Sequence, residues 1–153
     1  RHMSTGIILA YIGIGLMLGL AGVGSAIGVS MGGNATVGAL EKNDKAFTSY
    51  MILSAMPGTQ GLYGFAGFFV VNASGILSPE ITVLQGMAIM AAGFALGLVS
   101  LISAMRQGQI CANGIASIGS GHDVFGKTIV LAVFPELYAI VAFAATFLIN
   151  AGL

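Results

Sequence analysis

The sequence predicts an all-α integral membrane protein with four transmembrane helices, arranged as two duplicated helical hairpins. Three observations predict this class. Only 7% of the 153 residues are charged, whereas 57% are hydrophobic and the mean hydropathy is +0.99. The apolar residues lie in long continuous stretches rather than in the alternating pattern of barrel strands. The two halves of the chain also match each other in sequence.

Four apolar stretches of 23–25 residues are each long enough to cross a bilayer, which needs about 20 residues in a helix. They are residues 7–31, 51–73, 81–105 and 128–152. We expect polar connections at 32–50 and 106–127, and a short connection at 74–80. Arg1-His2-Met3 resembles an expression scar before a native start at Met3.

The distribution of basic residues predicts the orientation in the membrane. The connections 32–50 and 106–127 hold four of the five Lys and Arg residues, which the positive-inside rule places in the cytoplasm. Both termini and residues 74–80 then lie on the opposite side of the cell membrane. The net charge of zero argues against nucleic-acid binding, and the lone Cys111 excludes a disulfide framework.

An internal duplication divides the chain into a first hairpin, residues 4–76, and a second hairpin, residues 77–153. Residues 52–73 align with 130–151 without a gap, so that the segment FVVNA meets FLINA near their ends. The copies share one orientation because an even number of spans separates them, which argues against an inverted-repeat transporter.

Small residues recur at helical spacing along the first span. One stripe holds Gly15, Gly19, Gly22 and Ala26, and a second holds Ala21, Gly24, Gly28 and Gly32. Small residues allow helices to approach closely in lipid. Two adjacent stripes predict neighbours on more than one side, which suits an inner helix of a closed homo-oligomeric ring. The alternative is packing within a single four-helix bundle.

Glu136 is the only ionisable residue that falls well inside a predicted span, about a third of the way from its cytoplasmic end. An acid at that depth is costly and indicates a functional site. The alternative is a neutral glutamic acid with a purely structural role. The first repeat has Gly58 at the equivalent position, so one carboxylate serves two hairpins.

The second span offers a polar face in place of an acid. Met56, Thr59, Gln60 and Tyr63 have the spacing i, i+3, i+4 and i+7, which places them on one side of a helix. Gln107, at the predicted end of the third span, adds an amide. Pro57 and Pro135 each remove a helical hydrogen bond and leave carbonyl oxygens free. These groups together predict a cage of oxygen atoms around Glu136.

Three motifs resemble those of proteolipid subunits, which form the rotor ring of bacterial V-type (V/A-type) rotary ATPases. They are PGTQGLYG at 57–64, RQGQ at 106–109 and PELYAI at 135–140. The resemblance implies a ring of identical subunits that is not itself catalytic. Each subunit would carry one ion past an arginine of a stator subunit, while central-stalk subunits bind the cytoplasmic loops.

In the sodium-binding branch of that family, a carboxylate, a threonine, two glutamines and a backbone carbonyl bind the ion, and a tyrosine locks the site. The resemblance places these roles on Glu136, Thr59, Gln60, Gln107, the Met56 carbonyl and Tyr63. Tyr63 would donate a hydrogen bond to Glu136. A shell of about five oxygens suits Na⁺, since hard cations require several oxygen ligands. A ring that carries H⁺ instead is the alternative.

Two other classes are weaker candidates. A small multidrug antiporter also has four helices and one buried Glu, but usually in its first helix and within aromatic-rich walls. A purely structural or pore-forming protein leaves Thr59, Gln60, Gln107 and Glu136 unexplained. The sequence contains no phosphate loop and no nucleophile–base pair that would indicate an enzyme.

Overall fold

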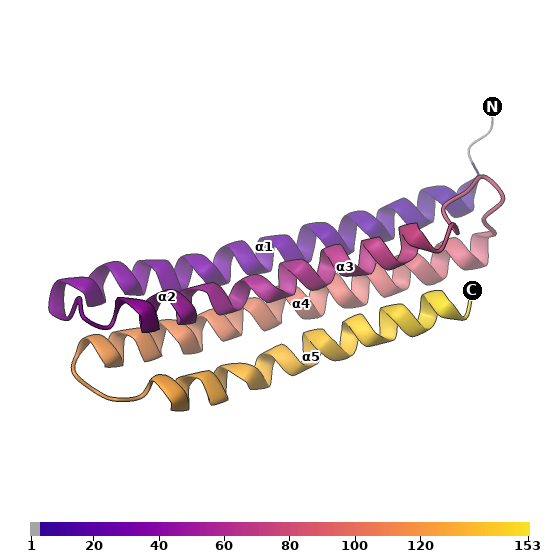
Figure 1. The fold of residues 1–153 in the computed structure, drawn as a ribbon. Coiled ribbons are helices and arrows are strands. Elements are labelled where there is room, and N and C mark those ends of the chain that lie inside the picture. The colour runs from indigo at the N-terminus through magenta and orange to yellow at the C-terminus, as the bar shows by residue number, and fades with distance from the viewer. Residues whose placement is uncertain (1–3) are drawn as a thin grey trace.

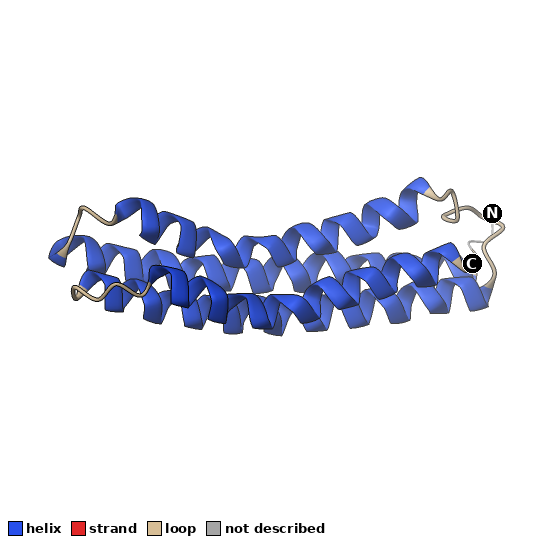
Figure 2. Ribbon diagram, turned by 60° about the horizontal axis from the view of Figure 1, so that its bottom comes forward, coloured by secondary structure: helices blue, strands red, loops and turns tan. Residues whose placement is uncertain are grey.

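The computed structural model describes residues 4–153, and these form helices joined by short connections, without a strand. The helices are α1 (Thr5–Lys42), α2 (Phe47–Ala55), the 3₁₀ helix η1 (Met56–Gly58), α3 (Thr59–Ala73), α4 (Val83–Gly119) and α5 (Phe125–Ala151). They lie side by side in an elongated bundle (Figures 1 and 2). The start of α1 and the end of α5 lie at one end of the bundle, and the α1–α2 and α4–α5 connections lie at the other. The all-helical prediction is confirmed, whereas the predicted scar lies outside the described residues.

Local signals fix where the helices begin. Ser4 caps α1 by accepting a hydrogen bond from the Ile7 N–H at 3.2 Å. Thr82 and Gln85 form a reciprocal capping box at the start of α4, with hydrogen bonds of 3.0 and 3.1 Å. These caps satisfy backbone N–H groups that have no partner within the helix.

Helices α1 and α4 are longer than the sequence predicted. They contain 38 and 37 residues, which corresponds to about 57 Å at 1.5 Å per residue. The hydrocarbon core of a bilayer is only about 30 Å thick, so both helices continue well beyond one. The predicted polar connections at 32–50 and 106–127 were therefore wrong over most of their length. The true connections are residues 43–46 and 120–124.

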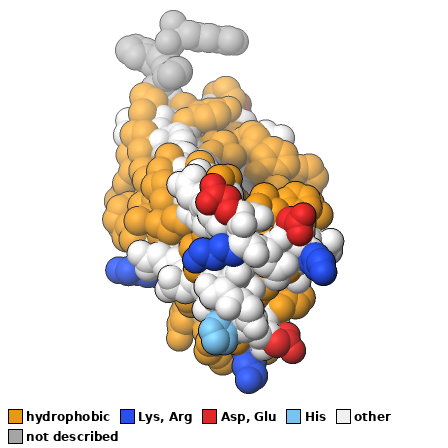
Figure 3. Space-filling view, turned by 90° about the vertical axis from the view of Figure 1, so that its left-hand side faces the viewer, with side chains coloured by type: hydrophobic (Ala, Val, Ile, Leu, Met, Phe, Trp, Pro, Cys, Tyr) orange, Lys and Arg blue, Asp and Glu red, His pale blue; other side chains and the backbone are white. Residues whose placement is uncertain are grey.

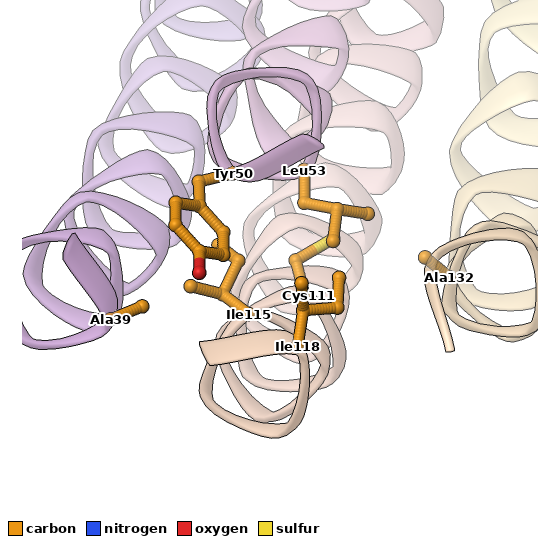
Figure 4. Close-up of a cluster of buried hydrophobic side chains, with 7 residues drawn as sticks. All are labelled: Ala39, Tyr50, Leu53, Cys111, Ile115, Ile118 and Ala132. Atoms are coloured by element: carbon orange, nitrogen blue, oxygen red, sulfur yellow. The ribbon is translucent and has the colours of Figure 1, made fainter. Parts of the chain in front are cut away.

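A buried cluster explains why the chain stays helical in these extensions. The cluster joins residues from α1, α2, α4 and α5 (Figure 4): Ala39, Tyr50, Leu53, Cys111, Ile115, Ile118 and Ala132. Tyr50 is fully buried, and its hydroxyl donates to the carbonyl of Asn43 at 2.8 Å. Tertiary packing thus outweighs the polar composition that suggested loops.

Glycines bring α1 and α4 into backbone contact. A Cβ atom at Gly28 would lie 2.5 Å from the carbonyl oxygen of Ala104, and one at Gly24 would lie 2.6 Å from the Cα of Leu101. The stripe that contains Gly24 and Gly28 therefore packs within the chain. The other stripe is exposed, and apart from the adjoining backbone of α1 no described atom lies within 4 Å of a Cβ built at Gly15, Gly19 or Gly22.

Three helices of the described chain are long and apolar enough to cross a membrane, namely α1, α4 and α5. The predicted second span, residues 51–73, is divided by η1 into the nine-residue α2 and the 15-residue α3. Pro57 accounts for this break because it lacks an N–H and crowds the preceding turn. Pro135, by contrast, lies inside α5 without dividing it.

Candidate ion-binding site

Oxygen atoms from three helical segments gather around the hydroxyl of Thr59, the first residue of α3. Its Oγ1 lies 3.2 Å from the carbonyl oxygen of Met56 in η1 and 3.1 Å from Oε1 of Gln60. It also hydrogen-bonds to Oε1 of Glu136 on α5. A hydroxyl has only one hydrogen, so it can donate fully to only one of these three acceptors. The other oxygens remain available to a cation.

The break in the helix at Pro57 positions two of these groups, the Met56 carbonyl and the Thr59 side chain. At the end of η1, the backbone N–H of Thr59 donates to the carbonyl of Met56, three residues earlier in the chain. The change of helical pitch brings the Met56 carbonyl and the Thr59 side chain to the same side as Glu136. Glu136 itself is half-buried, one residue after Pro135.

Two fully buried amides lie beside this group. Nε2 of Gln60 donates to Oε1 of Gln107 at 3.0 Å and to Oγ of Ser103 at 3.2 Å. Nε2 of Gln107 donates to the carbonyl of Ala132 at 2.8 Å. Ser103 donates to the carbonyl of Pro135 at 2.8 Å. The amides of α3 and α4 are thereby linked to α5, the helix that carries the carboxylate.

The structure brings together Glu136, Thr59, Gln60, Gln107 and the Met56 carbonyl, although the sequence placed Gln107 wrongly. Gln107 lies inside α4 and not at the end of that helix, which continues to Gly119. Ser103 was missed. Its spacing of i−4 from Gln107 was the one available signal, because that spacing places both on the same face.

Tyr63 lies one turn after Thr59 in α3, and its ring stacks on Phe143 of α5 with centroids 6.4 Å apart. The hydrogen bonds among residues 4–153 do not include one between Tyr63 and Glu136. The gate bond therefore stays a prediction.

The oxygens near Glu136 come mainly from neutral groups. Within the described part of the chain, no three His, Cys, Asp or Glu side chains lie close enough together to hold a metal ion. One carboxylate among neutral hydroxyl, amide and carbonyl oxygens matches the charge of one monovalent cation.

A groove of about 930 Å³ lies beside this site, between α4 and α5. Its walls are almost entirely apolar and include Ile102, Leu131, Phe134 and Tyr138. Arg106 also lines it, and its guanidinium donates to Gln109 of the same helix at 3.0 Å. The sequence had suggested that Arg106 lies in a connecting loop, whereas it lies within α4.

Comparison with known proteins identifies the family. The model of the family described as the C subunit of ATP synthase matches twice, over residues 12–71 and 90–149. The V-type sodium ATPase subunit K of Enterococcus hirae is 32% identical over 95% of this chain and 92% of that protein. The A-type ATP synthase subunit K of Methanocaldococcus jannaschii is 34% identical over 98% of this chain, which spans 65% of its length. The double match agrees with the predicted duplication, and the chain belongs to the family of ATP synthase C subunits.

Proposed function

We propose that the chain is a rotor-ring subunit of a V/A-type rotary ATPase, and that it carries Na⁺ at Glu136. It is a multi-pass membrane protein and a non-catalytic part of the complex. The observation that supports the ion site most strongly is the group of oxygens around Thr59. Met56, Gln60 and Glu136 each present an acceptor to one hydroxyl, which can satisfy only one of them.

Na⁺ fits this arrangement better than H⁺. A proton needs only the carboxylate, and Thr59, Gln60 and Gln107 would then have no role. A hard cation instead requires several oxygens to replace its hydration shell. The relative from Enterococcus hirae is described as a sodium ATPase subunit, which also favours Na⁺.

We further propose that identical chains close into a ring with four membrane-crossing segments each, residues 47–73 acting together as the second. The exposed strip of Gly15, Gly19 and Gly22 and the apolar groove between α4 and α5 offer surfaces to neighbouring copies. A stator subunit supplies an arginine to Glu136 as each site passes it. That positive charge compensates the carboxylate when it is empty.

The charged end of the bundle faces the cytoplasm in this proposal and binds the central stalk. Charged side chains gather there (Figure 3), around the α1–α2 and α4–α5 connections. The exposed Lys42, Lys45 and Lys127 favour that side by the positive-inside rule.

With Cys111 replaced, a thiol introduced by Asp44→Cys should react with an impermeant reagent from the cytoplasmic side only. Reaction of Ser78→Cys from that side would contradict the orientation.

The decisive test is protection of Glu136 from a carbodiimide, which attacks only the protonated acid. The purified ring should be labelled without Na⁺, and millimolar Na⁺ should prevent labelling at neutral pH while K⁺ does not. Glu136→Gln should remove the labelled position and leave a ring of normal size. If Na⁺ gives no protection, the ring carries H⁺ instead.

A further inference from the structure

Ser103 of α4 contacts the site without belonging to the proposed cation shell. It is 6% exposed, and its hydroxyl lies between the side chain of Gln60 on α3 and the backbone of α5. We propose that Ser103 is a positioning residue that fixes the orientation of the Gln60 carboxamide, so that the amide oxygen rather than the nitrogen faces Glu136. This inference rests on the proposed Na⁺ site.

The hydroxyl of Ser103 has a single hydrogen. Ser103 donates it to the carbonyl of Pro135 at 2.8 Å, and a carbonyl can only accept. Towards Gln60, 3.2 Å away, the same oxygen can therefore offer only a lone pair. Gln60 must present an N–H to it. Its Oε1 is consequently turned to the other side, where it lies 3.1 Å from the hydroxyl of Thr59.

The orientation of the Gln107 amide is fixed by its partners in the same way. Its Nε2 donates to the carbonyl of Ala132 at 2.8 Å, so its Oε1 must face Gln60 and accept from it at 3.0 Å. Two carbonyls of α5 thus set the direction of both amides. The carbonyl of Ala132 orients Gln107 directly, and that of Pro135 orients Gln60 through Ser103. The helix that carries Glu136 also ensures that an oxygen meets the cation.

A reversed Gln60 would bring N–H groups against the bound cation, which repel it. Without the Ser103 hydroxyl, only the bond to Gln107 still opposes that reversal. Removal of groups that orient metal ligands typically weakens metal binding by 10- to 100-fold. We therefore expect Ser103→Ala to weaken Na⁺ binding at least about tenfold.

Ser100 provides the matched control. It lies one turn away on the same helix and is fully buried, and its hydroxyl has no hydrogen-bond partner among residues 4–153. Ser100→Ala removes the same atom from a similarly buried position without touching the amides.

The experiment compares the Na⁺ concentration that half-protects Glu136 from carbodiimide in purified rings. We expect Ser103→Ala to raise it about tenfold or more, and Ser100→Ala to leave it near that of the unmutated ring. In a Gln60→Leu background, Ser103→Ala should cause no further rise, because its effect acts through the amide. A purely structural role would add to Gln60→Leu rather than disappear.

If Ser103→Ala and the unmutated ring are half-protected at the same Na⁺ concentration, Ser103 does not have the proposed role, but the Na⁺ site stands. The same conclusion follows if the effects of Ser103→Ala and Gln60→Leu are fully additive. Absence of protection in the unmutated ring would overturn the Na⁺ site and this inference together. If Ser103→Ala does not assemble, Ser103→Cys gives the same comparison, since it keeps the side-chain size but replaces the hydroxyl with a weakly hydrogen-bonding thiol.

Discussion

At the scale of single residues, Thr59 is the centre of the proposed ion site. Its hydroxyl is the point at which the carbonyl of η1, the amide of α3 and the carboxylate of α5 meet. When the site is empty, Oε1 of Gln60 and Oε1 of Glu136 compete for that one hydrogen, whereas the Met56 carbonyl also accepts from the N–H of Thr59. A monovalent cation would supply the missing positive charge, whereas a proton on Glu136 would satisfy only one pair of oxygens.

Thr59→Val tests this position because valine keeps the shape and removes the oxygen. The loss of one ligand and the exposure of the Met56 carbonyl to an apolar methyl should weaken Na⁺ binding at least about tenfold, a cost of roughly 1.4 kcal/mol. Titration of ²²Na⁺ binding to the purified ring measures it. Thr59→Ser, which retains the hydroxyl, should bind within a few-fold of the unmutated ring. Unchanged affinity in Thr59→Val would remove the hydroxyl from the shell.

The pH dependence of binding follows from the single carboxylate. In the proposed site Na⁺ would bind the ionised form of Glu136, so binding of the ion would release whatever proton the empty site holds. Affinity for Na⁺ should therefore fall as pH falls, by up to about tenfold per pH unit where the empty site is protonated. Where it is already ionised, affinity should be independent of pH. Affinity that rises on acidification would contradict direct competition.

The composition of the site could be predicted from the sequence because its signals are local. Thr59 and Gln60 lie on one helical face, and Glu136 is an acid in an apolar stretch. Ser103 could not be identified in this way, since a serine among the small residues of α4 looks like packing. Its proposed role depends on a carbonyl group of another helix, which no pattern in α4 records.

At the scale of elements, the ends of α1 and α4 illustrate the limit of composition. Residues 32–42 and 106–119 contain Gly, Asn, Gln and charged residues, so they resemble connections. In the bundle they bury Ala39, Ile115 and Ile118 against α2 and each other. The extent of a helix is therefore decided by its neighbours, and those neighbours come from distant parts of the chain.

The contact between α1 and α4 predicts a strong effect of one methyl group. In Gly28→Ala the new Cβ would meet the Ala104 carbonyl oxygen and Cβ of Pro57, each at 2.5 Å, so the helices must separate. We expect a loss of about 1–3 kcal/mol in stability, seen as a lower midpoint of unfolding in a detergent titration. Gly58→Ala is the control, because its Cβ would lie 3.8 Å from the nearest atom, on Val29. Equal midpoints for the two variants would contradict close backbone contact.

At the scale of the whole molecule, many apolar side chains and a glycine strip have no partner within one chain, among the residues that the structure describes. Exposed residues such as Leu62, Leu84 and Tyr138 lie along several helices. Lipid can cover large side chains, but a strip of glycine gains little from lipid and allows another backbone to approach closely. The membrane class and the duplication followed from the sequence, whereas the folded bundle was needed to see which glycine stripe packs within the chain and which stays exposed.

Gly19→Leu separates folding of the chain from assembly. Apart from the adjoining backbone of α1, no described atom of the chain lies within 4 Å of a Cβ at Gly19, so the single chain should keep its helix content. If a neighbouring copy packs there, rings should fall apart at lower detergent concentration, as native mass spectrometry would measure. Gly38→Leu is equally open and its spacing places it on a different face of α1, so it should assemble normally. Intact Gly19→Leu rings would exclude this strip as the contact.

The unbroken course of α1 and α4 also has a mechanical meaning. Each is a single rod of more than 35 residues, and the two are braced against each other at Gly24 and Gly28 near the middle and at Ala39 and Gly119 near the end. Such a pair resists torsion far better than a flexible connection would. In the proposed ring, a force applied at the level of Glu136 would reach the charged end as torque, with little of it lost to elastic winding of the chain.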